Sequence, residues 1–83
     1  MEYDVTQAKL VGQYALELTF ADGAIKVVDL EGELWGEVFE PLREPDEFAK
    51  VRVDPDAGTI VWPNGADFSP EFLYRVGRVV TAA

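Results

Sequence analysis

The first third of the chain alternates apolar and polar residues, which is typical of β-strands. Between Tyr14 and Phe20 every second side chain is apolar, the two-residue period of a strand with one buried face. Asp22-Gly23 follows, and residues 25–30 form another apolar run. Asp-Gly between two such runs predicts a hairpin with a type I′ turn, because the central residues of that turn need positive φ. With a further strand over 3–11, this region predicts a three-stranded antiparallel meander.

The middle of the chain changes to helical spacing with frequent breaks. Apolar residues within 31–44 stand one or three positions apart, which favours a helix, but two glycines and a proline interrupt the pattern. We therefore expect a short helical turn and an irregular loop here. One further helical turn is predicted over 45–49, with Pro45 at its first position and acids at its positive end.

The last third of the chain predicts a second hairpin and then a helix. Residues 51–54 alternate apolar and charged side chains, 54–58 contain proline and glycine suited to a turn, and 59–62 are β-branched and aromatic. Ser69-Pro70 then supplies an N-cap and a first-turn proline, and Gly77 is suited to ending the helix that follows.

Together these patterns predict the α+β class in one domain over 1–83: an antiparallel three-stranded meander, short helical turns, a second β-hairpin and a C-terminal helix packed on the sheet. Residues 79 and 80 are expected to add a short edge strand or to fray. Because a chain of this length buries only a thin core, copies are expected to form a homo-oligomer through an exposed sheet edge or the region of Trp35. The predicted core consists of Leu16, Leu18, Phe20, Val27, Phe39, Leu42, Phe48, Val51, Val53, Ile60, Trp62, Phe72, Leu73 and Val76.

The amino-acid composition excludes several kinds of catalytic and metal chemistry. The chain contains no Cys and no His, so it lacks thiol nucleophiles, disulfides and the commonest general base near neutral pH. Ser69 is the only serine, and a Ser-His-Asp triad is therefore impossible. Carboxylates alone rarely build a zinc site. We expect no catalytic residue, no cofactor and no metal site, and the chain is not predicted to be an enzyme.

The net charge of −9 also narrows the range of partners. A strongly acidic chain repels phosphates, so direct binding to nucleic acid is not expected. The apolar runs are only a few residues long, far below the roughly 20 needed to cross a bilayer. The first residues do not resemble a signal peptide, which makes the cytoplasm the default location.

Acidic residues concentrate in the segment 29–47, which has eight acids and only Arg43 as a base, a local charge of −7. Such a segment is either a solvated face that aids solubility or a docking surface for a basic protein. Trp35 lies inside it, either as a core anchor or as a partly exposed contact. The candidate partner-binding residues are Glu33, Trp35, Glu37, Phe39 and Glu40.

The most distinctive stretch is Trp62-Pro63-Asn64-Gly65-Ala66-Asp67. Asn-Gly favours positive φ, and the aspartate is able to accept backbone amides or to start the helix. The stretch is either a structural elbow between strand and helix or a loop site for a ligand or partner. The candidate residues of such a loop site are Trp62, Asn64, Asp67 and Tyr74.

Several blocks of this sequence occur in an order that is specific when taken together. Leu18-x-Phe20-x-Asp22-Gly23 is followed by Val51-x-Val53-Asp54, and then by the stretch from Thr59 to Asp67 with Pro70 and Leu73-Tyr74 behind it. Over about residues 3–76 this order resembles the bacterial domain-of-unknown-function family 2442. The resemblance implies a compact α+β domain with a C-terminal helix and an unassigned role, so no catalytic residue carries over.

The resemblance also implies a kind of partner, since some relatives are encoded beside another small uncharacterised protein in an arrangement similar to a toxin–antitoxin pair. With the acidic segment, it predicts a non-enzymatic protein-interaction or regulatory module, in one version an antitoxin-like partner of a small basic protein. The alternative is a small-ligand-binding regulatory domain that uses the loop from Trp62 to Asp67.

Overall fold

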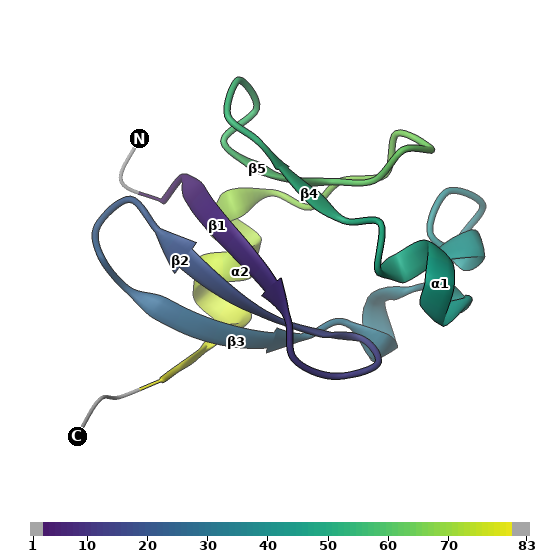
Figure 1. Ribbon diagram of the computed structural model, residues 1–83, viewed down its shortest axis with the longest axis horizontal. Coiled ribbons are helices and arrows are strands. Elements are labelled where there is room, and N and C mark those ends of the chain that lie inside the picture. Colours follow the sequence, from purple (N-terminus) through teal and green to yellow (C-terminus); the bar gives the residue numbers. More distant parts are fainter. Residues whose placement is uncertain (1–2, 81–83) are drawn as a thin grey trace.

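Two antiparallel sheets and a C-terminal helix make up the fold of residues 3–80, the part of the chain that the computed structural model describes (Figure 1). The predicted α+β class is therefore confirmed, including the short helical turns in the middle. The elements in chain order are β1 (Val5–Leu10), β2 (Ala15–Phe20), β3 (Ile25–Asp29), the 3₁₀ turns η1 (Glu31–Glu33) and η2 (Glu40–Arg43), α1 (Pro45–Phe48), β4 (Arg52–Asp54), β5 (Thr59–Val61), α2 (Pro70–Val76) and β6 (Arg78–Val79).

The larger sheet has the strand order β1-β2-β3-β6, and all its strands are antiparallel to their neighbours. The predicted meander forms β1 to β3, and the short edge strand expected at the end of the chain is β6, which pairs with β3. The predicted second hairpin forms the separate β4–β5 sheet. It packs beside β1, where Val5 N donates to Gly58 O at 2.9 Å.

Strand β2 carries the centre of the core, because Leu16, Leu18 and Phe20 are all fully buried on one face. The inner face of β3 differs from the sequence prediction by one residue. Val28 is buried, whereas Val27 is only half-buried on the other face, opposite Glu17. The prediction of Val27 in the core is thus wrong.

The reason for the shift is Lys26, a charged residue on the inner face of β3. Its ammonium group lies 3.5 Å from the ring centre of Tyr74 and donates to the Tyr74 carbonyl at 2.7 Å. A lysine can occupy an inward position at the end of a sheet when its stem covers apolar surface and its charge meets an aromatic ring and a carbonyl. An alternation judged from apolar residues alone misses such a position.

The β2–β3 turn is a hairpin, as predicted, but it is not of type I′. Gly23 N donates to Phe20 O at 2.9 Å and Phe20 N donates to Ala24 O at 2.9 Å. Only Gly23 has positive φ, at 91°, so Asp22 stays in the ordinary region. These features define a type I turn followed by a glycine bulge, which matches the strand twist in a three-residue loop.

Helix α2 packs on the inner face of the larger sheet through Leu73, which is fully buried. Ser69 is the predicted N-cap, and its Oγ accepts from Phe72 N at 3.3 Å. Gly77 ends the helix, as predicted, yet its φ of −69° is ordinary. Its role is close approach, since a Cβ at this position would lie 2.8 Å from Lys26 Cβ and 3.0 Å from Leu73 O.

Val76 is 44% exposed, and its prediction as a core residue is wrong. The line of closest contact between α2 and β3 runs through Leu73 and Gly77, which are four residues apart and therefore share a helix face. Val76 lies beside that line, at the last residue of the helix. The sequence prediction therefore put Val76 at the contact with β3, where the structure has Gly77.

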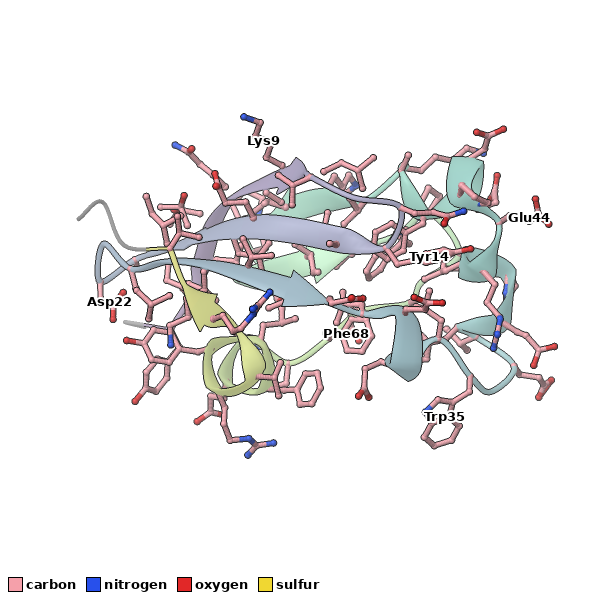
Figure 2. The ribbon with its side chains drawn as sticks, turned by 90° about the horizontal axis from the view of Figure 1, so that it is seen from below. Lys9, Tyr14, Asp22, Trp35, Glu44 and Phe68 are labelled. Carbon is pink, nitrogen blue, oxygen red and sulfur yellow. The ribbon has the colours of Figure 1, made fainter. Side chains whose placement is uncertain are left out.

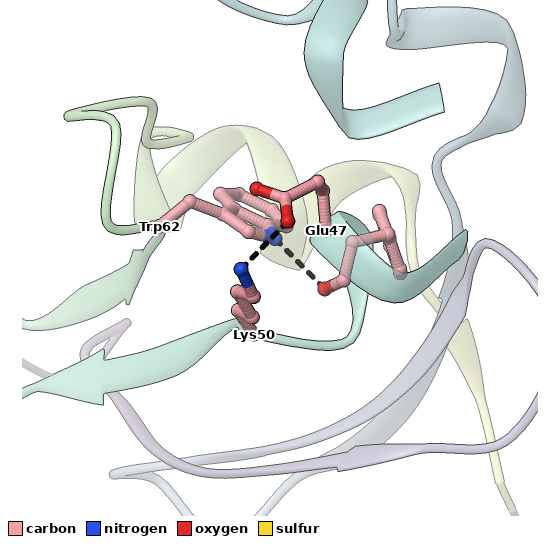
Figure 3. Close-up of polar contacts among 4 residues, drawn as sticks. Glu47, Lys50 and Trp62 are labelled. Atoms are coloured by element: carbon pink, nitrogen blue, oxygen red, sulfur yellow. Dashed lines mark hydrogen bonds and ion pairs between the residues drawn. The ribbon is translucent and has the colours of Figure 1, made fainter. Parts of the chain in front are cut away.

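The rest of the core follows from aromatic packing between the second hairpin and α1. Trp62 is buried, and its ring centre lies 5.5 Å from that of Phe48 with the ring planes tilted by 46°. Its Nε1 donates to Phe48 O at 2.9 Å (Figure 3). Eight predicted core residues are buried: Leu16, Leu18, Phe20, Leu42, Phe48, Ile60, Trp62 and Leu73. Four are partly buried, namely Phe39, Val51, Val53 and Phe72, and six buried residues were not predicted: Val5, Val28, Leu30, Leu34, Ala66 and Phe68.

Candidate functional site: the acidic surface around Trp35

Trp35 projects from the protein instead of entering its core. Its side chain is 68% exposed, the highest value among the large apolar residues that the structure describes as exposed (Figure 2). The preceding residue, Leu34, is fully buried, and Gly36 follows with a φ of 90°. The chain therefore turns sharply at this point, so that one side chain anchors the loop inside and the next faces water.

Carboxylates line two hollows at the loop that carries Trp35. A hollow of about 640 Å³ is lined by Asp29, Glu31, Gly32, Leu34, Trp35 and Arg43. A second hollow of about 460 Å³ is lined by Gly36, Glu37, Glu40 and Pro41. Glu33 is exposed as well. We call Asp29, Glu31, Glu33, Trp35, Glu37 and Glu40 the Trp35 surface.

The loop that carries this surface is fastened to the body of the protein. Arg43 Nη1 donates to Leu34 O at 3.3 Å, and the hydroxyl of Tyr14 donates to Arg43 O. Leu42 is buried beneath the segment. Arg43 is the only base within 29–47. Its hydrogen bond to Leu34 is to the backbone carbonyl and not to a carboxylate of the Trp35 surface.

Phe39 does not belong to the exposed surface in the way that the sequence suggested. It is half-buried, and its ring packs 4.8 Å from the ring of Phe68. Its neighbour Val38 is 48% exposed and provides apolar surface next to Glu37 instead. Sequence reasoning missed Val38, since the direction of each side chain in an irregular loop depends on tertiary contacts and not on a fixed period.

The stretch from Trp62 to Asp67 forms a turn with the same hydrogen bonds as the β2–β3 turn. Gly65 N donates to Trp62 O at 3.0 Å, and Trp62 N donates to Ala66 O at 2.9 Å. Asn64 Oδ1 accepts from Ala66 N at 3.0 Å. Positive φ is confined to Gly65, at 90°, and Asp67 forms an isolated bridge with Val61. Trp62 and Asn64 therefore have structural roles.

Asn64 also connects this turn to the Trp35 surface. Its Nδ2 donates to Val38 O at 2.9 Å. An aspartate at this position would accept the turn hydrogen bond but would have no donor for the carbonyl. The distinctive Asn-Gly pair thus holds the segment between Glu37 and Glu40 against the second hairpin.

Tyr74, the fourth predicted loop residue, lies at the β2–β3 turn rather than at the Asn64 turn. Its hydroxyl donates to Asp22 Oδ2 at 2.6 Å, and its ring packs 5.0 Å from Phe20. The hydrogen bond from Tyr74, with smaller contributions from Ala24 N–H and the Lys26 charge, lowers the pKa of Asp22 below its ordinary value of 3.8. Figure 2 places Asp22 at the opposite end of the molecule from Trp35.

A known protein family matches most of the chain. A family model described as a protein of unknown function, DUF2442, matches residues 5–78. The chain belongs to the DUF2442 family. The match confirms the family that the sequence blocks resemble. No curated protein and no solved structure matches the chain.

Both candidate regions lie within the DUF2442 match, which spans the Trp35 surface and the Asn64 turn. In the described part of the chain no group of three Asp or Glu side chains is arranged to hold a metal ion. None of the helices formed by residues 3–80 has the length and apolarity that a membrane crossing requires. The Trp35 surface places carboxylates beside one exposed aromatic side chain.

Proposed function

We propose that this protein is a non-enzymatic interaction module whose Trp35 surface binds a basic surface on a protein partner. The observation that carries the proposal is the 68% exposure of Trp35 in the middle of the acidic segment. A large aromatic side chain in water gains much contact area when a partner covers it, and aromatic anchors dominate the energy of many interfaces.

The chemistry of the surface favours a cationic partner. Tryptophan is the best aromatic acceptor for a lysine or arginine cation, and the carboxylates beside it attract the same groups. The net charge of −7 within 29–47 would also speed the encounter with a basic protein and repel acidic ones.

The contacts that hold the loop in place support the same proposal, because they reduce the conformational entropy that is lost on binding. Leu34 is buried, Val38 O accepts from Asn64, and Arg43 donates to Leu34 O, so the loop is fastened at three positions. A surface that is already ordered loses less conformational freedom when a partner binds.

An antitoxin-like role is the more specific version of this proposal, and it rests on the resemblance to relatives encoded beside a second small protein. In that version the partner is a small basic protein encoded next to this one, and binding covers the partner's basic surface. The alternative of a ligand site at the Asn64 turn has no comparable support, because the contacts of Trp62 and Asn64 serve the turn and the core.

The test is a fluorescence titration with an arginine-rich peptide of defined sequence. Trp35 is exposed whereas Trp62 is buried, so binding should change the emission of Trp35 and leave that of Trp62 unchanged. The change should be lost in Trp35→Phe. Reversal of charge at the surface by Glu33→Lys, Glu37→Lys and Glu40→Lys should weaken binding by about tenfold or more.

The matched control makes the same change in net charge elsewhere. Asp56, Asp67 and Glu71 are exposed acids outside the acidic segment 29–47. Replacing these three with lysine should weaken binding only slightly. Equal losses in the two triple variants would mean that the peptide responds to total charge alone, and the proposal would then be wrong.

A further inference from the structure

A second exposed patch lies around the edge strand β6. Val79 is 63% exposed, Val76 is 44% and Val80 is 43%. Two exposed arginines, Arg75 and Arg78, alternate with these valines along the sequence, and Arg78 and Val79 lie on opposite faces of the strand. From Arg75 onward the sequence contains no acid, in contrast to the rest of this strongly acidic chain. We call Arg75, Val76, Arg78, Val79 and Val80 the basic edge.

The geometry of β6 keeps this edge open in the described part of the chain. The strand is the last in the order β1-β2-β3-β6, so only β3 is paired with it. Val79 pairs with Lys26, and Val80 N donates to Ile25 O at 2.9 Å. An edge strand with apolar side chains and open backbone groups is a surface suited to association.

The basic edge and the Trp35 surface lie at different ends of the molecule. Figure 2 shows β6 toward the end that carries Asp22, whereas Trp35 is at the other end of the long axis. The principal extents of the molecule are 35 × 27 × 18 Å. The two surfaces are therefore separate, and one copy presents both at once.

We propose that the Trp35 surface of one copy binds the basic edge of a second copy. This inference rests on the proposed function, since it identifies one basic protein surface that the Trp35 surface fits. The two patches are complementary, with carboxylates and an exposed indole on one and arginines and exposed valines on the other. Neither patch complements itself, because like charges would face each other across a two-fold axis.

Contacts of this kind are head-to-tail, and they build rings or open chains according to whether the rotation between copies closes. Each copy has a net charge of −9, so long-range repulsion opposes the contact and weakens it. We therefore expect association that depends on protein concentration, with an average mass that rises above the 9.2 kDa of one chain.

Two blocked variants provide the decisive experiment. The first carries Trp35→Ala, Glu37→Lys and Glu40→Lys, and retains an intact basic edge. The second carries Arg75→Gln and Arg78→Gln, and retains an intact Trp35 surface. In sedimentation velocity each variant alone should remain at 9.2 kDa, whereas an equal mixture should form a species of twice that mass and no larger one. Only a head-to-tail contact gives this result.

The control variant, Glu44→Lys with Asp46→Lys, changes the net charge as much as the two lysines of the first variant do. It should self-associate at least as strongly as the unaltered chain, because it reduces the net repulsion between copies and leaves both surfaces intact. Circular dichroism of every variant verifies folding, and all the changed side chains are exposed. If the first variant does not fold, Glu37→Lys with Glu40→Lys replaces it.

Three results would overturn the proposal: an unaltered chain that stays monomeric up to its solubility limit, blocked variants that still self-associate, or a mixture that shows no complex. The peptide titration separates these failures from a failure of the proposed function. If the unaltered chain binds the arginine-rich peptide through Trp35 but stays monomeric, the Trp35 surface recognises basic partners and self-association alone is rejected.

Discussion

Asn64 donates from its side-chain amide to the carbonyl of Val38 at 2.9 Å, and this contact links the second hairpin to the loop that carries Trp35. The same amide accepts from Ala66 N at 3.0 Å, so each of its ends has a separate function. Asp22 occupies the equivalent position in the β2–β3 turn, where its Oδ1 accepts from Ala24 N at 2.9 Å. The two turns thus share one geometry but differ in the need for a donor.

Asn64→Asp should lower the free energy of unfolding by about 1–3 kcal/mol, because it removes the donor and places a carboxylate against the Val38 carbonyl. Urea denaturation measures the loss. Faster amide exchange at Phe39 and Glu40, whose N–H groups bond to Gly36 O, would locate it in the Trp35 loop. Gln13→Glu is the control: it adds the same negative charge at an exposed position and should change stability by less than about 0.5 kcal/mol. Equal effects of the two changes would contradict this role of Asn64.

Gly77→Ala should destabilise the protein by about 1–3 kcal/mol, because the added methyl group would be forced into the backbone and side chains that already touch. The ideal Cβ lies 2.8 Å from Lys26 Cβ and 3.1 Å from Val28 Cγ1. Gly32→Ala is the matched control, since no atom lies within 4 Å of its added methyl group. Thermal unfolding of both variants makes the comparison, and a Gly77→Ala variant as stable as Gly32→Ala would exclude the close approach.

Trp62→Phe should cost about 2–4 kcal/mol, because it removes the indole donor to Phe48 O and leaves part of a filled site empty. Trp35→Phe should change stability by no more than about 0.5 kcal/mol, since most of that side chain is in water. Denaturant unfolding followed by circular dichroism is the appropriate measurement, because both variants alter fluorescence. A large loss in Trp35→Phe would show that Trp35 supports the core after all.

Tyr74→Phe should raise the pKa of Asp22 toward its ordinary value of 3.8, because the hydroxyl is the main cause of the lowered pKa. The pKa of Asp22 is lower in the folded protein than in the unfolded chain, so this group adds stability above the unfolded value. That contribution is lost as the pH falls through the folded pKa. An NMR titration of the Asp22 carboxyl group tests the shift. An unchanged pKa in Tyr74→Phe would assign the shift to Ala24 N–H and Lys26 instead.

The strands were predictable because their signals are local. The alternation in β2 and the turn residues at Asp22-Gly23 report on neighbours within a few positions, and the register follows from them. The turn type was not predictable in the same way, since Asp-Gly fits both a type I′ turn and a type I turn with a bulge. The start of α2 was predictable for the same reason, because its signal is the adjacent pair Ser69 and Pro70.

The parts that sequence reasoning missed depend on contacts between distant residues. Lys26 lies on the inner face of β3, where its ammonium group meets the ring of Tyr74, and Phe39 packs against the ring of Phe68. The exposure of Trp35 was left open for the same reason. Its acidic neighbours marked the region as a candidate surface, but the burial of Leu34 beside it is a property of the folded chain.

The turn at Asn64 has a consequence for the chemical ageing of the protein. In an Asn-Gly pair the glycine nitrogen can attack the asparagine side-chain carbon, form a cyclic imide and release ammonia, and water then opens the ring to an acid. Here Gly65 N donates to Trp62 O, and both ends of the Asn64 amide are hydrogen-bonded. The bonds that join the hairpin to the Trp35 loop therefore also protect Asn64 from deamidation. A stored solution should gain the extra negative charge mainly through molecules in which this turn has opened.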